Sequence, residues 1–256
     1  MDINTSRNIT SVLTDKCAAG HILVYWLGGS GFVFKSADGK TICIDPYLSN
    51  SVEKQFGFRR LTLPPVTPDR LHFNMLLITH DHADHLDTGS FDALMDANPN
   101  CTIWASPSCD CYLKSTAVSY SIASPDDSMN FGEVSITALN ADHGELCPTA
   151  LGFMVTFGTR KLYFTGDTAY NRDLLSDSIA QKPEIIIPCI NGAFGNMDAS
   201  MAARLAKECG SRIAFPSHYG MFAEHGGSPE DFVNAVRSIS PSTRVELLAP
   251  GTGIEI

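Results

Sequence analysis

The sequence has no apolar run that approaches the roughly 20 residues needed to span a bilayer. Its first ten residues, MDINTSRNIT, are polar and lack the apolar stretch and the cleavage pattern of a secretory signal. These two absences predict that the chain neither spans a membrane nor is exported. We therefore expect it in the cytoplasm.

Basic residues are also scarce. The chain has 18 Lys and Arg against 28 Asp and Glu, and its formal net charge is −10. Nucleic-acid backbones are bound by an excess of Lys and Arg, so this charge disfavours nucleic acid as the main partner. We expect a small-molecule substrate instead. The sequence leaves open whether the chain forms homo-oligomers.

Cysteine pairs of the common metal-binding type are absent, because the eight cysteines include no CxxC spacing. Several of them lie in apolar runs such as TICID and IIIPCI, where Cys behaves as a small hydrophobic residue. We expect reduced thiols, as is usual in the cytosol. The spacing Cys109-Asp-Cys111 is only a weak indication of a metal site.

No low-complexity tract, long linker or fixed repeat divides the chain. After a polar arm at residues 1–20, apolar runs broken by Asp38-Gly39 and Gly158-Thr159 predict hairpins. Cap residues predict helices at 87–99 with Asp87 or Thr88 as N-cap, at 197–210 between Asp198 and Gly210, and at 228–239 with Ser228 as N-cap. Hairpins followed by helices, twice over, predict a single α/β domain over 1–256 with two sheets covered by helices.

The densest group of ionisable residues is in LLITHDHADHLD, residues 76–87, directly after a strand-like run. An extended loop would aim His80 and His82 the same way, while Asp84 and His85 could turn to a neighbouring point. Two adjacent ligand sets are what a two-metal site needs. Imidazole and carboxylate ligands suit Zn²⁺, Mn²⁺ or Fe²⁺ better than Ca²⁺. We therefore favour a metal site over ordinary surface or capping residues.

Four ligands cannot complete two metal ions, so more are expected at other strand ends. His143, Asp167 and His218 each follow a strand-like segment within one to three residues. Each alone has an ordinary alternative, as a turn former for Asp167 and as a loop histidine for the other two. As a set, they predict that the ligands meet at one rim of the sheets.

The HxHxDH pattern, followed by separated His, Asp and His, resembles the metallo-β-lactamase superfamily from VYWLGGSGFVF to SHYG. Within it, the chain is similar to the L-ascorbate-6-phosphate lactonase group and to its short relatives known only as metal-dependent hydrolases. The segments that carry this closer likeness are WLGGSGFVFKS, CIDPYLS, THDHADHLD, TGDTAYN, NGAFGNMDASMAARLA and FPSHYGMF. The resemblance implies a four-layer αββα sandwich, in which two mixed sheets are flanked by helices.

The resemblance also implies a role for each ligand. One metal would be held by His80, His82 and His143, the second by Asp84, His85 and His218, and Asp167 would bridge the two. Asp45 would orient a ligand histidine, or is simply a turn residue before Pro46. The chain is shorter than the ascorbate-type lactonases and keeps His143, which favours a full two-metal site over an ascorbate-type substrate.

The reaction implied is hydrolysis by a hydroxide shared between two divalent cations, with Zn²⁺ or Mn²⁺ preferred and Fe²⁺ as a third option. Asp84 is the candidate for moving the proton of the water. The expected substrate is a small, anionic metabolite, namely a lactone or a related ester.

Substrate contacts are predicted on loops beside the ligands, at Tyr170, Asn171, Asn191 and His225. Arg59 and Arg60 could meet an anionic group, although solvated surface residues are the ordinary alternative. Two other functions stay open. One is phosphodiester cleavage of the tRNA 3′-processing type, which the net charge disfavours. The other is a non-catalytic metal-binding scaffold, which the full set of seven ligands disfavours.

Overall fold

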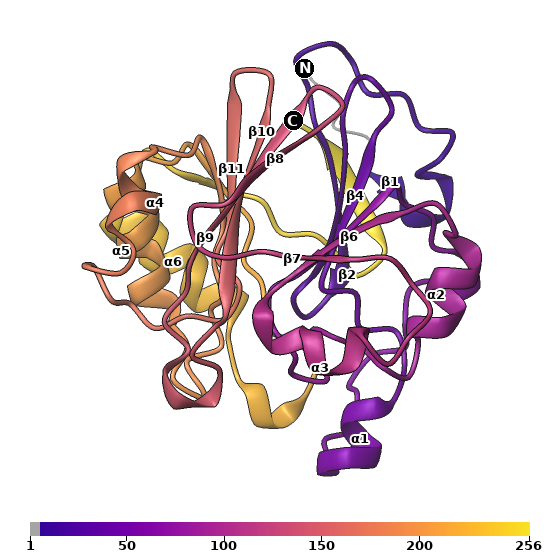
Figure 1. The fold of residues 1–256 in the computed structure, drawn as a ribbon. Coiled ribbons are helices and arrows are strands. Elements are labelled where there is room, and N and C mark those ends of the chain that lie inside the picture. The colour runs from indigo at the N-terminus through magenta and orange to yellow at the C-terminus, as the bar shows by residue number, and fades with distance from the viewer. Residues whose placement is uncertain (1–5) are drawn as a thin grey trace.

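The structure is a computed structural model that describes residues 6–256. Two mixed β-sheets pack face to face, and helices cover the outer face of each sheet (Figure 1). This is the four-layer αββα arrangement that the resemblance implies, and it confirms the two helix-covered sheets that the sequence pattern predicts. The layers matter for function because they bring the ends of strands from both sheets to one edge of the molecule.

Among the described residues, the first sheet has eight strands. In sheet order they are β1 (Arg7–Asn8), β15 (Thr252–Glu255), β2 (Leu23–Gly28), β3 (Gly31–Lys35), β4 (Thr41–Ile44), β5 (Met75–Ile78), β6 (Thr102–Ala105) and β7 (Ser121–Ile122). The second sheet has seven, in the order β14 (Arg244–Val245), β13 (Ile213–Ala214), β12 (Ile185–Ile187), β11 (Arg160–Phe164), β10 (Leu151–Phe157), β9 (Val134–Asn140) and β8 (Ser128–Phe131).

The core follows the two-residue period of the strands. In β2, Val24 and Trp26 belong to the large cluster that includes both sheets, whereas Leu23 and Tyr25 belong to the cluster between the first sheet and its helices. Successive side chains of a strand point to opposite faces, so a strand with helices on one side and a sheet on the other is apolar throughout. All six residues of β2 are buried.

The helices lie on both sides of the sandwich. They are α1 (Ser51–Phe56), α2 (Phe91–Ala97), α3 (Asp110–Leu113), α4 (Ser176–Ala180), α5 (Ala199–Cys209) and α6 (Pro229–Ile239). Helices α4, α5 and α6 cover the second sheet, α2 and α3 lie beside the first, and α1 projects at the lower end (Figure 1). The predicted caps of α5 and α6 are confirmed. Asp198 accepts a hydrogen bond from Met201 N, Gly210 is left-handed, and Ser228 accepts from Asp231 N.

The predicted start of α2 at Asp87 or Thr88 is wrong, because the helix begins at Phe91 after Ser90. The Asp87 carboxylate is used elsewhere. It accepts hydrogen bonds from Leu48 N at 2.9 Å, Ser49 N at 2.8 Å and Ser90 Oγ at 2.7 Å. Asp87 therefore ties the loop before α1 to the loop that carries the histidine cluster.

The predicted N-terminal arm is partly built into the first sheet. Residues 1–5 of it lie outside the described residues, but β1 pairs with β15, and Ile9 and Val12 are buried. The turns predicted at Asp38-Gly39 and Gly158-Thr159 are confirmed in the β3–β4 and β10–β11 hairpins. The β10–β11 turn lies at the upper end of the molecule in Figure 1, and the histidine loop lies at the opposite end.

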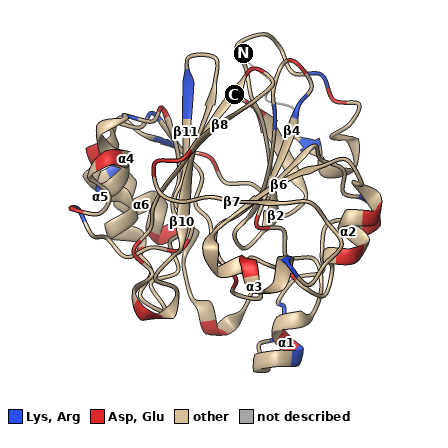
Figure 2. Ribbon diagram, in the orientation of Figure 1, with Lys and Arg blue, Asp and Glu red and all other residues tan. Residues whose placement is uncertain are grey.

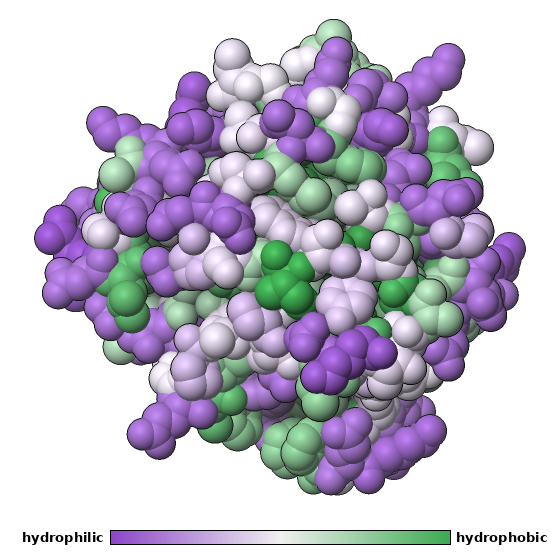
Figure 3. Space-filling model, viewed as in Figure 1, coloured by the Kyte–Doolittle hydropathy of each residue, from purple (hydrophilic) through white to green (hydrophobic). Residues whose placement is uncertain are grey.

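No helix within residues 6–256 is both long enough and apolar enough to cross a membrane. On the face in Figure 3, hydrophobic residues occur in small groups between hydrophilic ones. Acidic residues occupy several loops at the lower end of the sheets (Figure 2).

Candidate metal centre

The predicted ligands all follow strands that end at the same edge. β5 precedes the loop with His80, β9 precedes His143, β11 precedes Asp167 and β13 precedes His218. β11, β12 and β13 are parallel, and β9 runs the same way because two antiparallel pairings separate it from β11. The carboxyl ends of these strands therefore lie together, as for ligand sites in other α/β sheets.

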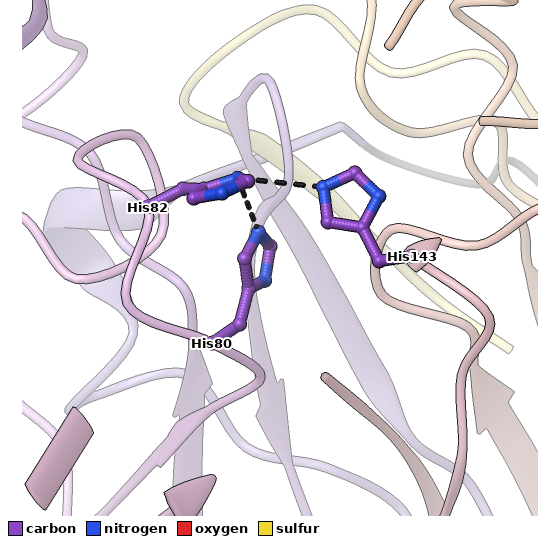
Figure 4. Close-up of side chains that lie close together, drawn as sticks. All are labelled: His80, His82 and His143. Atoms are coloured by element: carbon purple, nitrogen blue, oxygen red, sulfur yellow. Dashed lines mark hydrogen bonds between the residues drawn. The ribbon is translucent and has the colours of Figure 1, made fainter. Parts of the chain in front are cut away.

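His80, His82 and His143 form the first group of donor atoms (Figure 4). Nδ1 of His82 lies 3.0 Å from Nε2 of His80 and 3.4 Å from Nε2 of His143. His80 and His82 come from the loop after β5, and His143 comes from the loop after β9, so the first group joins the two sheets. The three donor atoms lie within 4.8 Å of one another, which is compatible with one shared cation.

Asp84, His85 and His218 form a second group. Nε2 of His218 lies 3.3 Å from Nε2 of His85 and 3.4 Å from Oδ2 of Asp84. His85 and His218 are buried, whereas Asp84 is partly exposed. The sequence expectation that Asp84 and His85 turn to a point next to that of His80 and His82 agrees with this geometry.

Asp167 lies between the two groups. Its Oδ1 is 3.4 Å from Nε2 of His85, and its Oδ2 is 3.2 Å from Nε2 of His218 and 3.8 Å from Nε2 of His143. It also forms a third set of close donor atoms with His80 and His85. This is the position that a bridging carboxylate requires.

In three of the histidines, the ring nitrogen that points away from the ligand groups has a hydrogen-bond partner. That partner determines whether the other ring nitrogen is free to bind a metal. Nε2 of His82 faces the carbonyl oxygen of Leu146 at 3.3 Å, so it carries a hydrogen. Nδ1 of His85 faces Asp45 at 2.7 Å. Nδ1 of His80 lies 3.0 Å from the hydroxyl oxygen of Thr79, and that hydroxyl donates to Asp45 at 2.5 Å. With a metal bound, each of these imidazoles would be neutral and would present the lone pair of its other ring nitrogen to the centre, as ligand histidines do.

These residues fit divalent cations. Among the described residues, no hydrogen-bond partner is present for Oδ1 of Asp167, although this atom is buried. A buried acceptor without a donor is costly, and several lone pairs that converge on one point can be satisfied together by a cation. Imidazole and carboxylate donors suit Zn²⁺, Mn²⁺ or Fe²⁺. None of the donor groups found among residues 6–256 includes a cysteine.

The carboxylates and imidazoles of the centre shift one another's pKa. Burial acts to lower the pKa of His218, but Asp167 and Asp84 outweigh it and raise that pKa to about 9. The pKa of His85 is raised in the same way: burial acts to lower it, but Asp167 and Asp84 outweigh burial. Burial acts to raise the pKa of both carboxyls, but His85 and His218 hold each pKa below its usual range. The pKa of His80 is lowered, by burial first and by His85 second.

A pocket of about 310 Å³ opens above the two groups. Its lining combines the ligands His82, Asp84, His143, Asp167 and His218 with Asp81, His225 and a set of apolar side chains. The predicted contact His225 is buried and stacks on His218, with ring centroids 4.8 Å apart. Burial first, and His218 second, lower the pKa of His225 to about 4, so its imidazole is neutral at pH 7.

The other predicted substrate contacts do not line this pocket. Within the described part of the chain, its lining leaves out Tyr170, Asn171 and Asn191. Asn171 donates to Asp142, Tyr170 lies under Arg204, and Asn191 lines a separate cavity at the starts of α5 and α6.

Arg59 and Arg60 do not reach the pocket either. Both line a different cavity beside α1. The Arg60 guanidinium donates to the carbonyl oxygens of Tyr47 at 2.9 Å and Ser49 at 3.2 Å, and it stacks on the Tyr47 ring. Its charge is therefore used to hold the loop before α1.

Sequence reasoning missed three supporting side chains. Thr79, directly before His80, links His80 to Asp45. Asn196 donates from Nδ2 to Oδ2 of Asp167 at 2.8 Å. Phe194 lines the pocket from the same Gly-rich segment, NGAFGN. The signals available in the sequence were the HxHxDH motif directly after Thr79 and the Gly-rich segment NGAFGN around Phe194 and Asn196. Neither segment shows a periodicity that would reveal which way its side chains point.

Comparison with known proteins agrees with the fold. Residues 40–219 match the family model described as "Beta-lactamase superfamily domain". A "UPF0173 metal-dependent hydrolase" of Caldivirga maquilingensis is 30% identical over 233 residues, which cover 88% of this chain and 94% of that protein. A protein of the same description from Aeropyrum pernix is 27% identical over 247 residues, covering 90% and 96%.

Solved structures share the fold. Igni18, a metallo hydrolase of the archaeon Ignicoccus hospitalis, superposes with a TM-score of 0.73 at 19% identity, covering 92% of this chain and 98% of that one. An isothiocyanate hydrolase from Delia radicum gut bacteria gives a TM-score of 0.70 at 19% identity, covering 91% and 98%. From the family match and the full-length relatives, this chain belongs to the metallo-β-lactamase superfamily, in the UPF0173 family of metal-dependent hydrolases.

Proposed function

We propose that this hydrolase opens small lactones or cleaves related esters at the centre formed by the seven ligand side chains. The observation that carries the proposal is that seven donors from loops of both sheets converge at the base of one pocket. We further propose two divalent cations, Zn²⁺ or Mn²⁺ with Fe²⁺ as a third option. One would be held by His80, His82 and His143, and the other by Asp84, His85 and His218, with Asp167 between them.

Such cations would supply activated water at neutral pH and polarise the carbonyl oxygen of the ester. The side chains then have separable tasks. Asp84 lines the pocket, so its carboxylate is placed to accept the proton that the water loses and to return it to the leaving oxygen. Asp45 and Thr79 fix the orientation of His80 and His85. The neutral His225 can donate a hydrogen bond to a substrate oxygen.

Phosphodiester cleavage is less well supported. The sequence also predicts an anionic substrate, but within residues 6–256 no Lys or Arg lines the pocket, so neither a nucleic acid nor an anionic metabolite finds a partner in the wall. We also propose a cytoplasmic location. Its support is that all eight cysteines are free.

The test is a screen of the protein after removal of metal and reloading with Zn²⁺ or Mn²⁺. The panel contains lactones, aryl esters, a phosphodiester and isothiocyanates, the last because a structural neighbour acts on them and they too carry an electrophilic carbon. We expect hydrolysis of lactones or esters by the wild type. His82→Ala and Asp167→Ala should each lower kcat/KM by about a thousandfold or more, since several kcal/mol of transition-state stabilisation is lost.

His21→Ala is the matched control, because His21 is half exposed and does not belong to the pocket lining. Near-normal turnover by either ligand variant with metal present would contradict the mechanism. A metal-loaded wild type that is inert towards the whole panel would favour the non-catalytic scaffold.

A further inference from the structure

The pocket beside the ligands also has an apolar wall. Five large apolar side chains, Val52, Phe56, Phe58, Leu146 and Phe194, line it together with Ala83, Gln55 and the polar base. Phe56, Leu146 and Phe194 are each about half exposed or more, at 62%, 55% and 47%. Large apolar side chains gathered at the mouth of a concave site are typical of a binding surface.

The aromatic rings of this wall contact His225, which lies beside the candidate ligands. Phe194 lies 5.4 Å from the ring of His225, and Phe58 lies 6.2 Å from it in an edge-on arrangement. The rings of Phe58 and Phe194 are 6.4 Å apart. Because His225 stacks on His218, the aromatic wall is continuous with the ligands. A group bound to this wall therefore lies next to the reacting end of a substrate.

The backbone at Phe194 is strained. Its φ of +54° is left-handed, which is uncommon for a bulky residue. Asn196 anchors the same loop by donating to Asp167, and Met197 N donates to Thr168 O at 2.9 Å. A strained backbone that presents an exposed aromatic ring beside a catalytic centre points to a function for that ring.

The wall offers no counter-charge. Of the described residues, no Lys or Arg lines the pocket, whereas Asp81, Asp84 and Asp167 do. A charged group placed against Phe58 and Phe194 would lose water without gaining a partner. An aromatic or alkyl group would gain from the same burial.

We infer that the substrate is uncharged and carries an aromatic or branched alkyl group that packs against Phe58 and Phe194, and that Phe194 is a specificity-determining residue. The inference rests on the proposed function, because it places the ester or lactone carbonyl over the ligand groups.

The test compares three lactones on the metal-loaded protein. They are γ-butyrolactone, γ-phenyl-γ-butyrolactone and its 4-carboxyphenyl analogue. We expect kcat/KM for the phenyl lactone to exceed that for each of the others by about tenfold or more, as expected for burial of one ring. Phe194→Ala should reduce the preference for the phenyl lactone over γ-butyrolactone by about tenfold. Phe58→Ala, on a different loop, repeats the measurement should Phe194→Ala not fold.

Leu247→Ala is the control, since Leu247 is equally exposed, at 50%, and lies outside the pocket. It should keep the wild-type preference. The inference is overturned if the carboxyphenyl lactone is the better substrate, or if Phe194→Ala and Phe58→Ala both retain the wild-type ratio. In either case hydrolysis of γ-butyrolactone would still support the proposed function.

If neither lactones nor esters are hydrolysed, the proposed function fails and binding decides the inference. Calorimetry on metal-free protein then compares 3-phenylpropanamide with 3-phenylpropanoate. We expect the neutral amide to bind more tightly, and its affinity to fall about tenfold in Phe194→Ala. Equal or tighter binding of the carboxylate, or unchanged amide binding by the variant, would refute the inference.

Discussion

Oδ2 of Asp45 lies 2.7 Å from Nδ1 of His85, and both side chains are completely buried. The same carboxylate also accepts hydrogen bonds from the backbone N of Thr79 at 2.9 Å and from its hydroxyl. Asp45 therefore acts on both ligand groups, directly through His85 and through Thr79 on His80. Its φ of +44° is left-handed, which Asp tolerates better than most residues.

Asp45→Asn should weaken metal binding without unfolding the chain. The amide keeps the size of the side chain and tolerates the same backbone conformation, but it removes the charge that orients His85. We expect metal affinity to fall by about ten- to a hundredfold, as measured by competition with a chromophoric chelator. Asp126→Asn is the control, because Asp126 is exposed and has a φ of +72°. Equal metal affinities for the two variants would show that the Asp45 charge does not support metal binding.

Metal affinity should rise with pH up to about 9. The pKa of His218 in the metal-free chain is raised from its usual 6.5 to about 9 by Asp167 and Asp84, so the imidazole holds a proton at pH 7. A cation must displace that proton. Below about pH 9, each pH unit should then cost up to about tenfold in affinity for each proton released.

Calorimetry at pH 7 in two buffers of different ionisation enthalpy measures this release. We expect at least one proton to leave when the metal binds. An affinity that stays constant from pH 6 to pH 9, with no buffer dependence of the heat, would show that the imidazoles are already unprotonated.

The ligand set was predictable from sequence because of where strands end. His143, Asp167 and His218 each follow a short apolar run, and parallel strands bring such positions to one edge of a sheet. The outline of the fold was predictable for a related reason, since hairpin turns and helix caps such as Asp198 and Ser228 act locally.

The wall of the pocket and the use of Asp87 were not predictable. Phe58 and Phe194 stand on irregular loops, where no period tells which side chains face inward. Asp87 has the sequence context of a helix cap, but six donors that are distant or adjacent in sequence converge on its carboxylate instead, and only the folded chain shows them.

Asp87→Ala should destabilise the metal-free protein by about 3 kcal/mol or more. The substitution leaves the buried Leu48 N without an acceptor and leaves the buried Ser51 Oγ with only the Ala83 carbonyl oxygen, at 3.4 Å. Each unsatisfied buried donor costs about 1–3 kcal/mol. Urea unfolding measures the loss. Asp92→Ala is the control, because Asp92 is exposed on α2. A change below about 0.5 kcal/mol for Asp87→Ala would mean that water replaces the carboxylate.

Gly166 controls where Asp167 sits, and a second glycine allows this to be tested cleanly. Gly166 and Gly158 have the same φ of +61°, so an alanine at either position pays the same backbone strain of about 1–2 kcal/mol. Their surroundings differ. A Cβ on Gly166 would lie 2.5 Å from the carbonyl oxygen of Leu151, whereas a Cβ on Gly158 meets nothing within 4 Å.

The backbone at Gly166 must therefore move to accept an alanine, and Asp167 moves with it. We expect Gly166→Ala to lose about tenfold or more in metal affinity, in the range of other changes to the support of metal ligands, in addition to stability. Gly158→Ala should lose only the stability that strain costs, because its turn lies at the end of the sandwich opposite the ligands. Chelator competition and urea unfolding on both variants separate these effects. If the two variants bind metal equally well, the position of Asp167 does not depend on the close approach of the chain at Gly166.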